Sequence, residues 1–219
     1  MIEAVIFDMD GLLVDSEPVW NKARQAMAAE AGKDWTLEDH KAVMGVSTQR
    51  WADYMIRRLE LTLSPQAVEA RMVARMAEMY RAGIPYFPGA VEAVHLAASH
   101  FPTALASGSH RALIDIVTAD AAMRGKFQVI LSSDEIGTSK PAPDVYLVAA
   151  QRLGVRPENC VCLEDSGNGI LAGVRAGMKV IAVPDPRFPP TPETLSQARR
   201  VLPALTEFSL ALLDQLGAE

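Results

Sequence analysis

The residues of this sequence that could do chemistry follow short apolar runs. The run at 4–7 leads into Asp8 and Asp10, and the run at 160–163 leads into Glu164 and Asp165. The runs at 103–106 and 128–131 precede a second polar set: Ser107, Gly108, Ser109 and Lys140. Carboxylate oxygens are ligands that Mg²⁺ prefers, together with water and phosphate oxygens. The acidic set therefore predicts a magnesium site with four candidate ligands, Asp8, Asp10, Glu164 and Asp165.

Beside a cation, the same residues predict phosphoryl transfer. A carboxylate is a recognised covalent nucleophile for phosphorus, so Asp8 could attack a phosphate ester. Asp10, two residues further on, could protonate the leaving oxygen and later deprotonate a water molecule. Ser107 and the amide of Gly108 could bind phosphoryl oxygens, while Lys140 stabilises their charge.

Each of these residues also has a purely structural interpretation. Asp8 and Asp10 could stabilise a turn at Gly11, and Ser107 or Ser109 could cap the next helix. Acidic residues are also favourable at a helix N-terminus, where a carboxylate meets the positive end of the dipole. Taken together, however, these interpretations leave several carboxylates at one place without a compensating cation, and the chemical interpretation does not.

Apolar runs alternate with helical patterns along most of the chain. The runs at 4–7, 103–106, 128–131, 160–163 and 180–183 have the continuous apolar character of strands buried on both faces. Helical patterns separate the later runs, at 109–122, 142–153 and 167–176. This alternation predicts an α/β fold with a Rossmann-like, doubly wound parallel sheet. Ligands bind outside the carboxyl ends of such strands, so the polar residues should meet at one edge.

The first interval between runs is different, because it contains only helical patterns. These lie near 17–31, 36–43, 48–60 and 65–82, and a segment rich in proline and glycine follows at 83–90. We therefore expect a helical cap domain, residues 16–87, inserted into an α/β catalytic core formed by 1–15 and 88–219.

Composition excludes several other classes of protein. The net charge is −6 without a lysine- or arginine-rich run, so we expect no nucleic-acid partner. We also expect no membrane partner, since no apolar stretch approaches the roughly 18 residues of a membrane span. Cys160 and Cys162 alternate on one expected strand, a spacing that rarely suits a disulfide, which favours a reduced, cytoplasmic protein.

The polar motifs together resemble those of the haloacid dehalogenase (HAD) superfamily, in the subgroup with a helical cap after the first strand. DMDG at 8–11, Ser107, Lys140 in KPAPDVY and EDSGNG at 164–169 match its four motifs in order. The resemblance implies Asp8 as the nucleophile and Asp10 as the acid/base. It also implies Mg²⁺ held by the Asp8 side chain, the Asp10 carbonyl and Asp165, with Glu164 close by.

Within this superfamily the sequence is similar to sugar-phosphate phosphatases and to β-phosphoglucomutases. Asp10 argues against dehalogenation, because a halide leaves without a proton. The mutases have a histidine where this chain has Trp20, and an arginine that grips the second phosphate where it has Thr48. We therefore expect phosphate hydrolysis, with a sugar phosphomutase or a phosphoglycolate phosphatase as the alternatives.

The resemblance also implies that the cap selects the substrate. The segment at 44–51 is similar to the specificity loop of such caps, so Thr48, Gln49 and Arg50 are the candidate substrate-binding residues. Trp51 has a competing and stronger interpretation, as a residue packed inside the cap. The expected partner is a small phosphorylated metabolite, and the expected assembly is a monomer or a weak dimer.

Overall fold

The computed structural model describes residues 1–44, 46 and 48–218. The chain forms two compact units, one comprising Met1–Asp15 with Pro85–Glu219 and the other Ser16–Ile84. We call the first the core and the second the cap.

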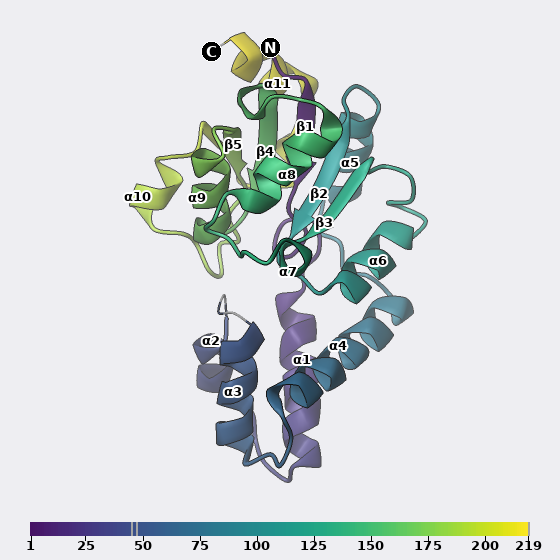
Figure 1. Cartoon of the computed structure of the whole chain (residues 1–219), viewed down its shortest axis with the longest axis vertical. Coiled ribbons are helices and arrows are strands. Elements are labelled where there is room, and N and C mark those ends of the chain that lie inside the picture. The colour runs from purple at the N-terminus through teal and green to yellow at the C-terminus, as the bar shows by residue number, and fades with distance from the viewer. Residues whose placement is uncertain (45, 47, 219) are drawn as a thin grey trace. The chain divides into compact units, whose positions relative to one another are not determined.

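The core is built on a six-stranded parallel sheet (Figure 1) with the strand order β3-β2-β1-β4-β5-β6. Its strands are β1 (Ala4–Phe7), β2 (Thr103–Ser107), β3 (Val129–Ser132), β4 (Cys160–Glu164), β5 (Lys179–Ala182) and β6 (Arg200–Val201). The first five correspond to the five apolar runs, so the predicted α/β sheet is confirmed. The sixth was not predicted, because two residues are too short to give an apolar run.

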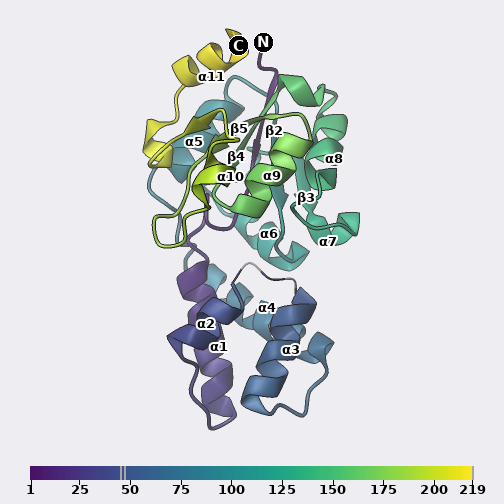
Figure 2. The ribbon, with the colours of Figure 1, turned by 90° about the vertical axis from the view of Figure 1, so that its left-hand side faces the viewer.

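Helices cover both faces of this sheet. The core contains α5 (Ala90–Ala98), α6 (Arg111–Ala119), α7 (Ser133–Ile136), α8 (Asp144–Leu153), α9 (Gly167–Arg175), α10 (Pro192–Leu195) and α11 (Leu210–Ala218), with 3-10 turns at Pro157–Asn159 and Leu205–Glu207. Figure 2 shows α8 and α9 on one side of the sheet and α5 and α11 on the other.

Alternation along β1 explains why both faces are apolar. Ile6 belongs to the cluster formed with α8 and α9, while Phe7 makes edge contacts with the rings of Phe127 and Phe208. Burying one such side chain contributes about 1.5–3 kcal/mol. Phe7, the last residue of β1, is in register with Leu105 on β2 and Leu163 on β4, and these two strands end only two and one residues later, at Ser107 and Glu164. The polar residues that follow them are thereby brought to one edge.

The described residues of the cap form four helices, α1 (Glu17–Glu30), α2 (Leu37–Ala42), α3 (Thr48–Leu59) and α4 (Pro65–Ala82). Thr36 begins α2 with a capping box, and Ser64 begins α4 by accepting from the amide of Ala67. Methionines fill much of the cap interior: Met27, Met55, Met72 and Met76. None of the described helices of the chain is long and apolar enough to cross a membrane.

The second boundary between the units lies before Pro85, whereas the sequence placed it before Pro88. Residues 85–87 pair with 13–15: the Asp15 amide donates to the Pro85 carbonyl at 2.8 Å, and the Phe87 amide donates to the Leu13 carbonyl at 2.9 Å. These backbone bonds tie the returning chain to the segment that leaves β1, and they assign it to the core.

Candidate active site

A tight turn after β1 presents the first two acids. The amides of Leu13 and Val14 donate to the Met9 carbonyl, and the Gly11 amide donates to the Val14 carbonyl. Gly11 has a φ of +82°, in the left-handed region that favours glycine. A β-carbon at this position would lie 2.1 Å from Asp165 Oδ2, so glycine is required there for a second reason. The turn therefore packs its backbone directly against the acid that follows β4.

Lys140 joins the acids of two strands. Its Nζ donates to Asp8 Oδ1 at 2.5 Å, to Glu164 Oε1 at 2.5 Å and to the Ala106 carbonyl at 3.0 Å. Asp8 is 6% exposed and Glu164 is fully buried, so both ion pairs are shielded from solvent. Buried charges are tolerated when they are paired and hydrogen-bonded, and Lys140 uses three donors in this way.

Both carboxylate oxygens of Glu164 accept hydrogen bonds. Tyr146 Oη on α8 donates to Oε1, the oxygen that also accepts from Lys140, and Ser166 Oγ donates to Oε2 at 3.3 Å. Ser166 in turn caps α9 by accepting from the Gly169 amide at 3.1 Å. A β-carbon on Gly169 would overlap the Glu164 carboxylate, so this glycine lets the helix approach the acid.

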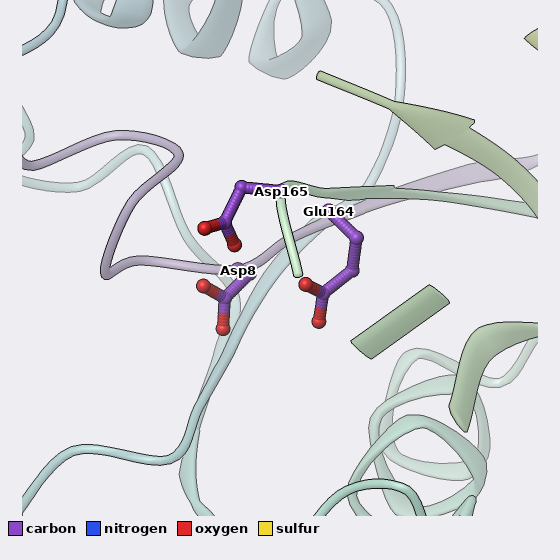
Figure 3. Close-up of side chains that lie close together, drawn as sticks. All are labelled: Asp8, Glu164 and Asp165. Carbon is purple, nitrogen blue, oxygen red and sulfur yellow. The ribbon is translucent and has the colours of Figure 1, made fainter. Parts of the chain in front are cut away.

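Three carboxylates gather at the predicted magnesium site (Figure 3). Asp8, Glu164 and Asp165 each place one oxygen within 4.8 Å of the others. Lys140 supplies one ammonium group in direct contact, so three ionised acids would leave two negative charges uncompensated. A divalent cation has the matching charge, and an all-oxygen donor set suits Mg²⁺.

The electrostatics agree with a site built for a cation. Burial raises the pKa of Asp8 to about 7; the charges of Glu164 and Asp10 act in the same direction, while Lys140 opposes them. Burial likewise raises the pKa of Asp165 well above its ordinary value, assisted by Glu164 and Asp8. Burial alone would lower the pKa of Lys140, but its attraction to Asp8 and Glu164 raises it instead. Without a cation these carboxylates are therefore costly to ionise together.

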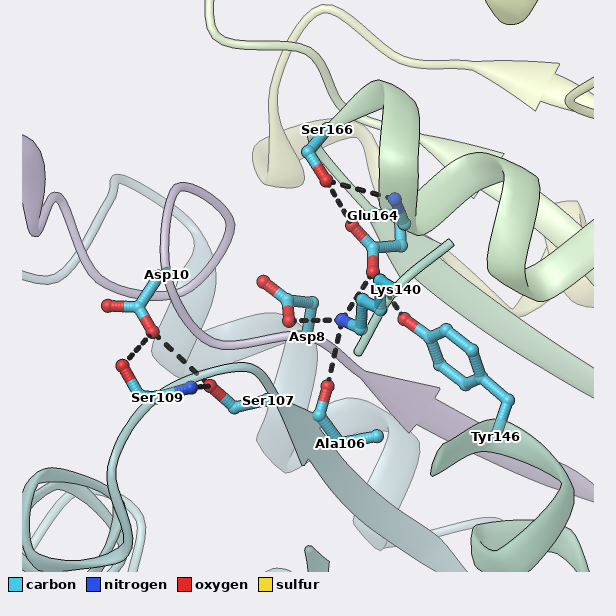
Figure 4. Close-up of polar contacts among 10 residues, drawn as sticks. Asp8, Asp10, Ala106, Ser107, Ser109, Lys140, Tyr146, Glu164 and Ser166 are labelled. Carbon is cyan, nitrogen blue, oxygen red and sulfur yellow. Dashed lines mark hydrogen bonds and ion pairs between the residues drawn. The ribbon is translucent and has the colours of Figure 1, made fainter. Parts of the chain in front are cut away.

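Asp10 points away from this cluster, toward β2 (Figure 4). Its Oδ2 accepts from Ser109 Oγ at 2.5 Å and from Ser107 Oγ at 3.2 Å. The Asp10 side chain is not among the described carboxylates that converge with Asp8. Of the four predicted metal ligands, Asp10 is therefore the one that would have to bind the ion through its backbone carbonyl. That is the atom the family resemblance implies.

The predicted phosphate-binding residues lie beside these acids. Ser107 ends β2 with its hydroxyl accepting from the Ser109 amide at 3.0 Å, and Gly108 is exposed in the turn that follows. Neither serine caps α6, because that helix begins after His110, whose Nδ1 accepts from the Ala112 amide. The structural interpretation of Ser107 and Ser109 as helix caps is therefore wrong.

Within the cap, the predicted substrate-binding residues lie in the first turn of α3. Thr48 is half-buried, Gln49 and Arg50 are exposed, and Gln49 donates to the Asp53 carboxylate at 3.1 Å. Gly45 and Ser47 of the predicted specificity loop lie outside the described residues. Trp51 is buried, with its ring centroid 6.0 Å from that of Trp20. The interpretation of Trp51 as a residue packed inside the cap is confirmed.

Three residues that hydrogen-bond to the acids of the site were not predicted from the sequence to do so: Ser109, Tyr146 and Ser166. Ser109 belongs to the polar set that follows the apolar run at 103–106, but no role other than that of a possible helix cap was predicted for it. Tyr146 looks like a core aromatic of a helix, and nothing in its sequence context indicates a bond to Glu164. Ser166 carries the stronger signal, since it directly precedes the helical pattern at 167–176 and serine is a favoured residue at the N-cap of a helix.

Comparison with known proteins assigns the family. A family model described as haloacid dehalogenase-like hydrolase matches residues 2–177. The chain belongs to this family. The resemblance to this family that was inferred from the motifs is therefore confirmed.

Several relatives of this HAD-like hydrolase are phosphatases. A probable pseudouridine-5'-phosphatase from Drosophila melanogaster is 37% identical, over 93% of this chain and 90% of that protein. Hexitol phosphatase B from Escherichia coli O157:H7 is 36% identical, over 99% of this chain and 97% of that protein. The crystal structure of CbbY from Rhodobacter sphaeroides in complex with phosphate has a TM-score of 0.83 and 28% identity, and covers 98% of this chain and 100% of that one. The protein is a phosphoric monoester hydrolase.

Proposed function

We propose that this hydrolase is a Mg²⁺-dependent phosphatase that releases phosphate from a small sugar or polyol phosphate through a phospho-Asp8 intermediate. One observation carries the proposal: the ammonium group of Lys140 binds both the Asp8 carboxylate and Glu164, at the point where Asp8, Glu164 and Asp165 converge. A nucleophilic carboxylate, a fixed cation and a cation-binding acidic set are what phosphoryl transfer to aspartate requires.

The Asp8 and Asp165 side chains and the Asp10 carbonyl would hold the magnesium ion. Glu164 would lie beside it, since both of its oxygens already accept hydrogen bonds from Lys140, Tyr146 and Ser166. The bound ion would neutralise the excess negative charge and allow a phosphate dianion to approach Asp8.

The chain's own residues supply the rest of the reaction. Asp8 attacks phosphorus, and the bond between phosphorus and the leaving oxygen breaks as Asp10 gives that oxygen a proton. Asp10 then takes a proton from water, which attacks the phosphorus of phospho-Asp8 and restores the carboxylate. Lys140 stabilises negative charge on the transferring group. The products are the free alcohol and inorganic phosphate.

The substrate class rests on the relatives and on the cap. Phosphatases of sugar-like substrates are among those relatives, as the names pseudouridine-5'-phosphatase and hexitol phosphatase indicate. Thr48, Gln49 and Arg50 would contact the organic part of the substrate. Trp20 is half-buried, and its ring lies against that of Trp51. It offers no imidazole at the position where the mutases have one, which favours hydrolysis.

A panel of sugar, polyol and nucleotide phosphates, assayed for released phosphate with Mg²⁺ and with EDTA, tests the proposal. Release from at least one sugar or polyol phosphate that stops in EDTA and returns with Mg²⁺ is the expected result. Formation of an isomeric sugar phosphate faster than free phosphate would identify a mutase instead. Undiminished release in EDTA would contradict the proposed role of the metal.

A further inference from the structure

The hydroxyl of Ser109 is the nearer of the two serine donors to the proposed acid/base. Its Oγ lies 2.5 Å from Asp10 Oδ2, whereas Ser107 Oγ lies 3.2 Å from the same oxygen. Both serines are buried, Ser107 completely and Ser109 to 9% exposure. A short hydrogen bond from a hydroxyl to a carboxylate is among the stronger ones in proteins.

The two oxygens of Asp10 are in different situations. Oδ2 accepts from both serines, while Oδ1 is buried and has no hydrogen-bond partner among the residues that the structure describes. A buried carboxylate oxygen without a partner is costly and calls for an explanation. An atom that receives and delivers a proton during the reaction must be free of a permanent protein donor, and Oδ1 meets that requirement.

Ser109 is itself fixed by the neighbouring strand. Its carbonyl accepts from Ser132 Oγ at 2.7 Å, at the end of β3, and its amide donates to Ser107 Oγ. Ser132 is completely buried. Hydrogen bonds from the ends of two strands therefore fix the backbone of Ser109, and the hydrogen bond from its hydroxyl in turn fixes the Asp10 carboxylate.

We propose that Ser109 is a positioning residue for the general acid, an inference that rests on the proposed function. Ser109 fixes the Asp10 carboxylate through Oδ2 and leaves Oδ1 free to exchange the proton. This role differs from phosphate binding, which has been assigned to Ser107 and Gly108. It predicts a specific dependence on the leaving group, because only a poor leaving group needs the proton.

The experiment compares two substrates in wild type and in Ser109→Ala with saturating Mg²⁺. Fructose 1-phosphate has an alkyl leaving group that needs an acid, and p-nitrophenyl phosphate has a leaving group that does not. The comparison uses kcat/KM, which reports formation of phospho-Asp8 and excludes the hydrolysis that both substrates share. Ser109→Ala should lower kcat/KM about 10- to 100-fold for the sugar phosphate and no more than about threefold for the aryl phosphate.

Further variants separate positioning from folding. Asp10→Asn should show the same selectivity more strongly, and Ser109→Thr, which keeps a hydroxyl, should return the ratio of the two kcat/KM values to within about threefold of wild type. Ser109→Cys keeps the shape with a weaker donor and replaces the alanine variant if that variant does not fold. Ser99→Ala serves as a control, since that exposed hydroxyl donates to the Leu96 carbonyl within α5 and the turn after it.

Two results would overturn the inference, and they differ from failure of the proposed function. Equal losses for both substrates in Ser109→Ala would assign the hydroxyl to phosphate binding or to folding. No loss for either would show that Asp10 does not depend on it. If the wild type releases phosphate from neither substrate nor from any other phosphate ester, the proposed function fails first and the inference falls with it.

Discussion

Lys140 Nζ lies 2.5 Å from Asp8 Oδ1, across 132 positions of sequence, and forms a buried ion pair with it. Replacing the lysine by methionine keeps most of its stem but removes the cation. With saturating Mg²⁺, we expect Lys140→Met to lower kcat about 10²- to 10³-fold, as loss of a preorganised charge does in other enzymes. Steady-state kinetics, with circular dichroism to verify folding, measure this. A rate within about threefold of wild type would contradict the role of Lys140 in catalysis.

The contact between Gly11 and Asp165 predicts a selective effect on metal affinity. Gly11→Ala places a methyl group where Asp165 Oδ2 now lies, so the acid must move. Gly125→Ala is a matched control, because Gly125 has a φ of +71° with nothing within 4 Å of its β-carbon position. In both variants the alanine must adopt a left-handed backbone conformation, which costs about 1–2 kcal/mol. Only Gly11→Ala should raise the Mg²⁺ concentration needed for half-maximal activity, by about tenfold. Equal Mg²⁺ dependence in the two variants would show that Asp165 is not displaced from the metal.

The buried His40 should make the stability of the cap depend on pH. Burial and the nearby Arg24 guanidinium lower the pKa of His40 to about 4. Between pH 6.5 and 4 the unfolded chain binds a proton at this histidine that the folded cap does not, so stability falls as pH falls. The loss from pH 7 to pH 5 should be about 1–2 kcal/mol.

Urea unfolding followed by tryptophan fluorescence measures this effect in the cap, where Trp20, Trp35 and Trp51 all lie. His40→Gln should reduce the change in stability between pH 7 and pH 5, and His100→Gln, at an exposed position of the core, should not. An unchanged pH dependence in His40→Gln would show that another group is responsible.

Much of the site could be predicted from the positions of the strand ends. In a parallel sheet, the residues that follow the carboxyl ends of the strands lie at the same edge. Asp8, Lys140 and Glu164 could be grouped on that ground although they are far apart in sequence. The bond from Tyr146 to Glu164 could not, since it depends on how α8 packs on the sheet. The short strand β6 and the pairing of 85–87 with 13–15 also depend on tertiary contacts that leave no periodic pattern. Which oxygen of Asp10 is held, and by which serine, is a matter of side-chain geometry alone.

Covalent trapping at Asp8 tests the central claim most directly. Borohydride reduces an acyl phosphate to an alcohol, so enzyme quenched during turnover and then reduced should contain homoserine in place of Asp8, as mass spectrometry of the N-terminal peptide would show. The modification should require both substrate and Mg²⁺, and Asp8→Asn should release no phosphate. Full turnover without modification of Asp8, or with phosphate release retained in Asp8→Asn, would contradict the phospho-aspartate mechanism.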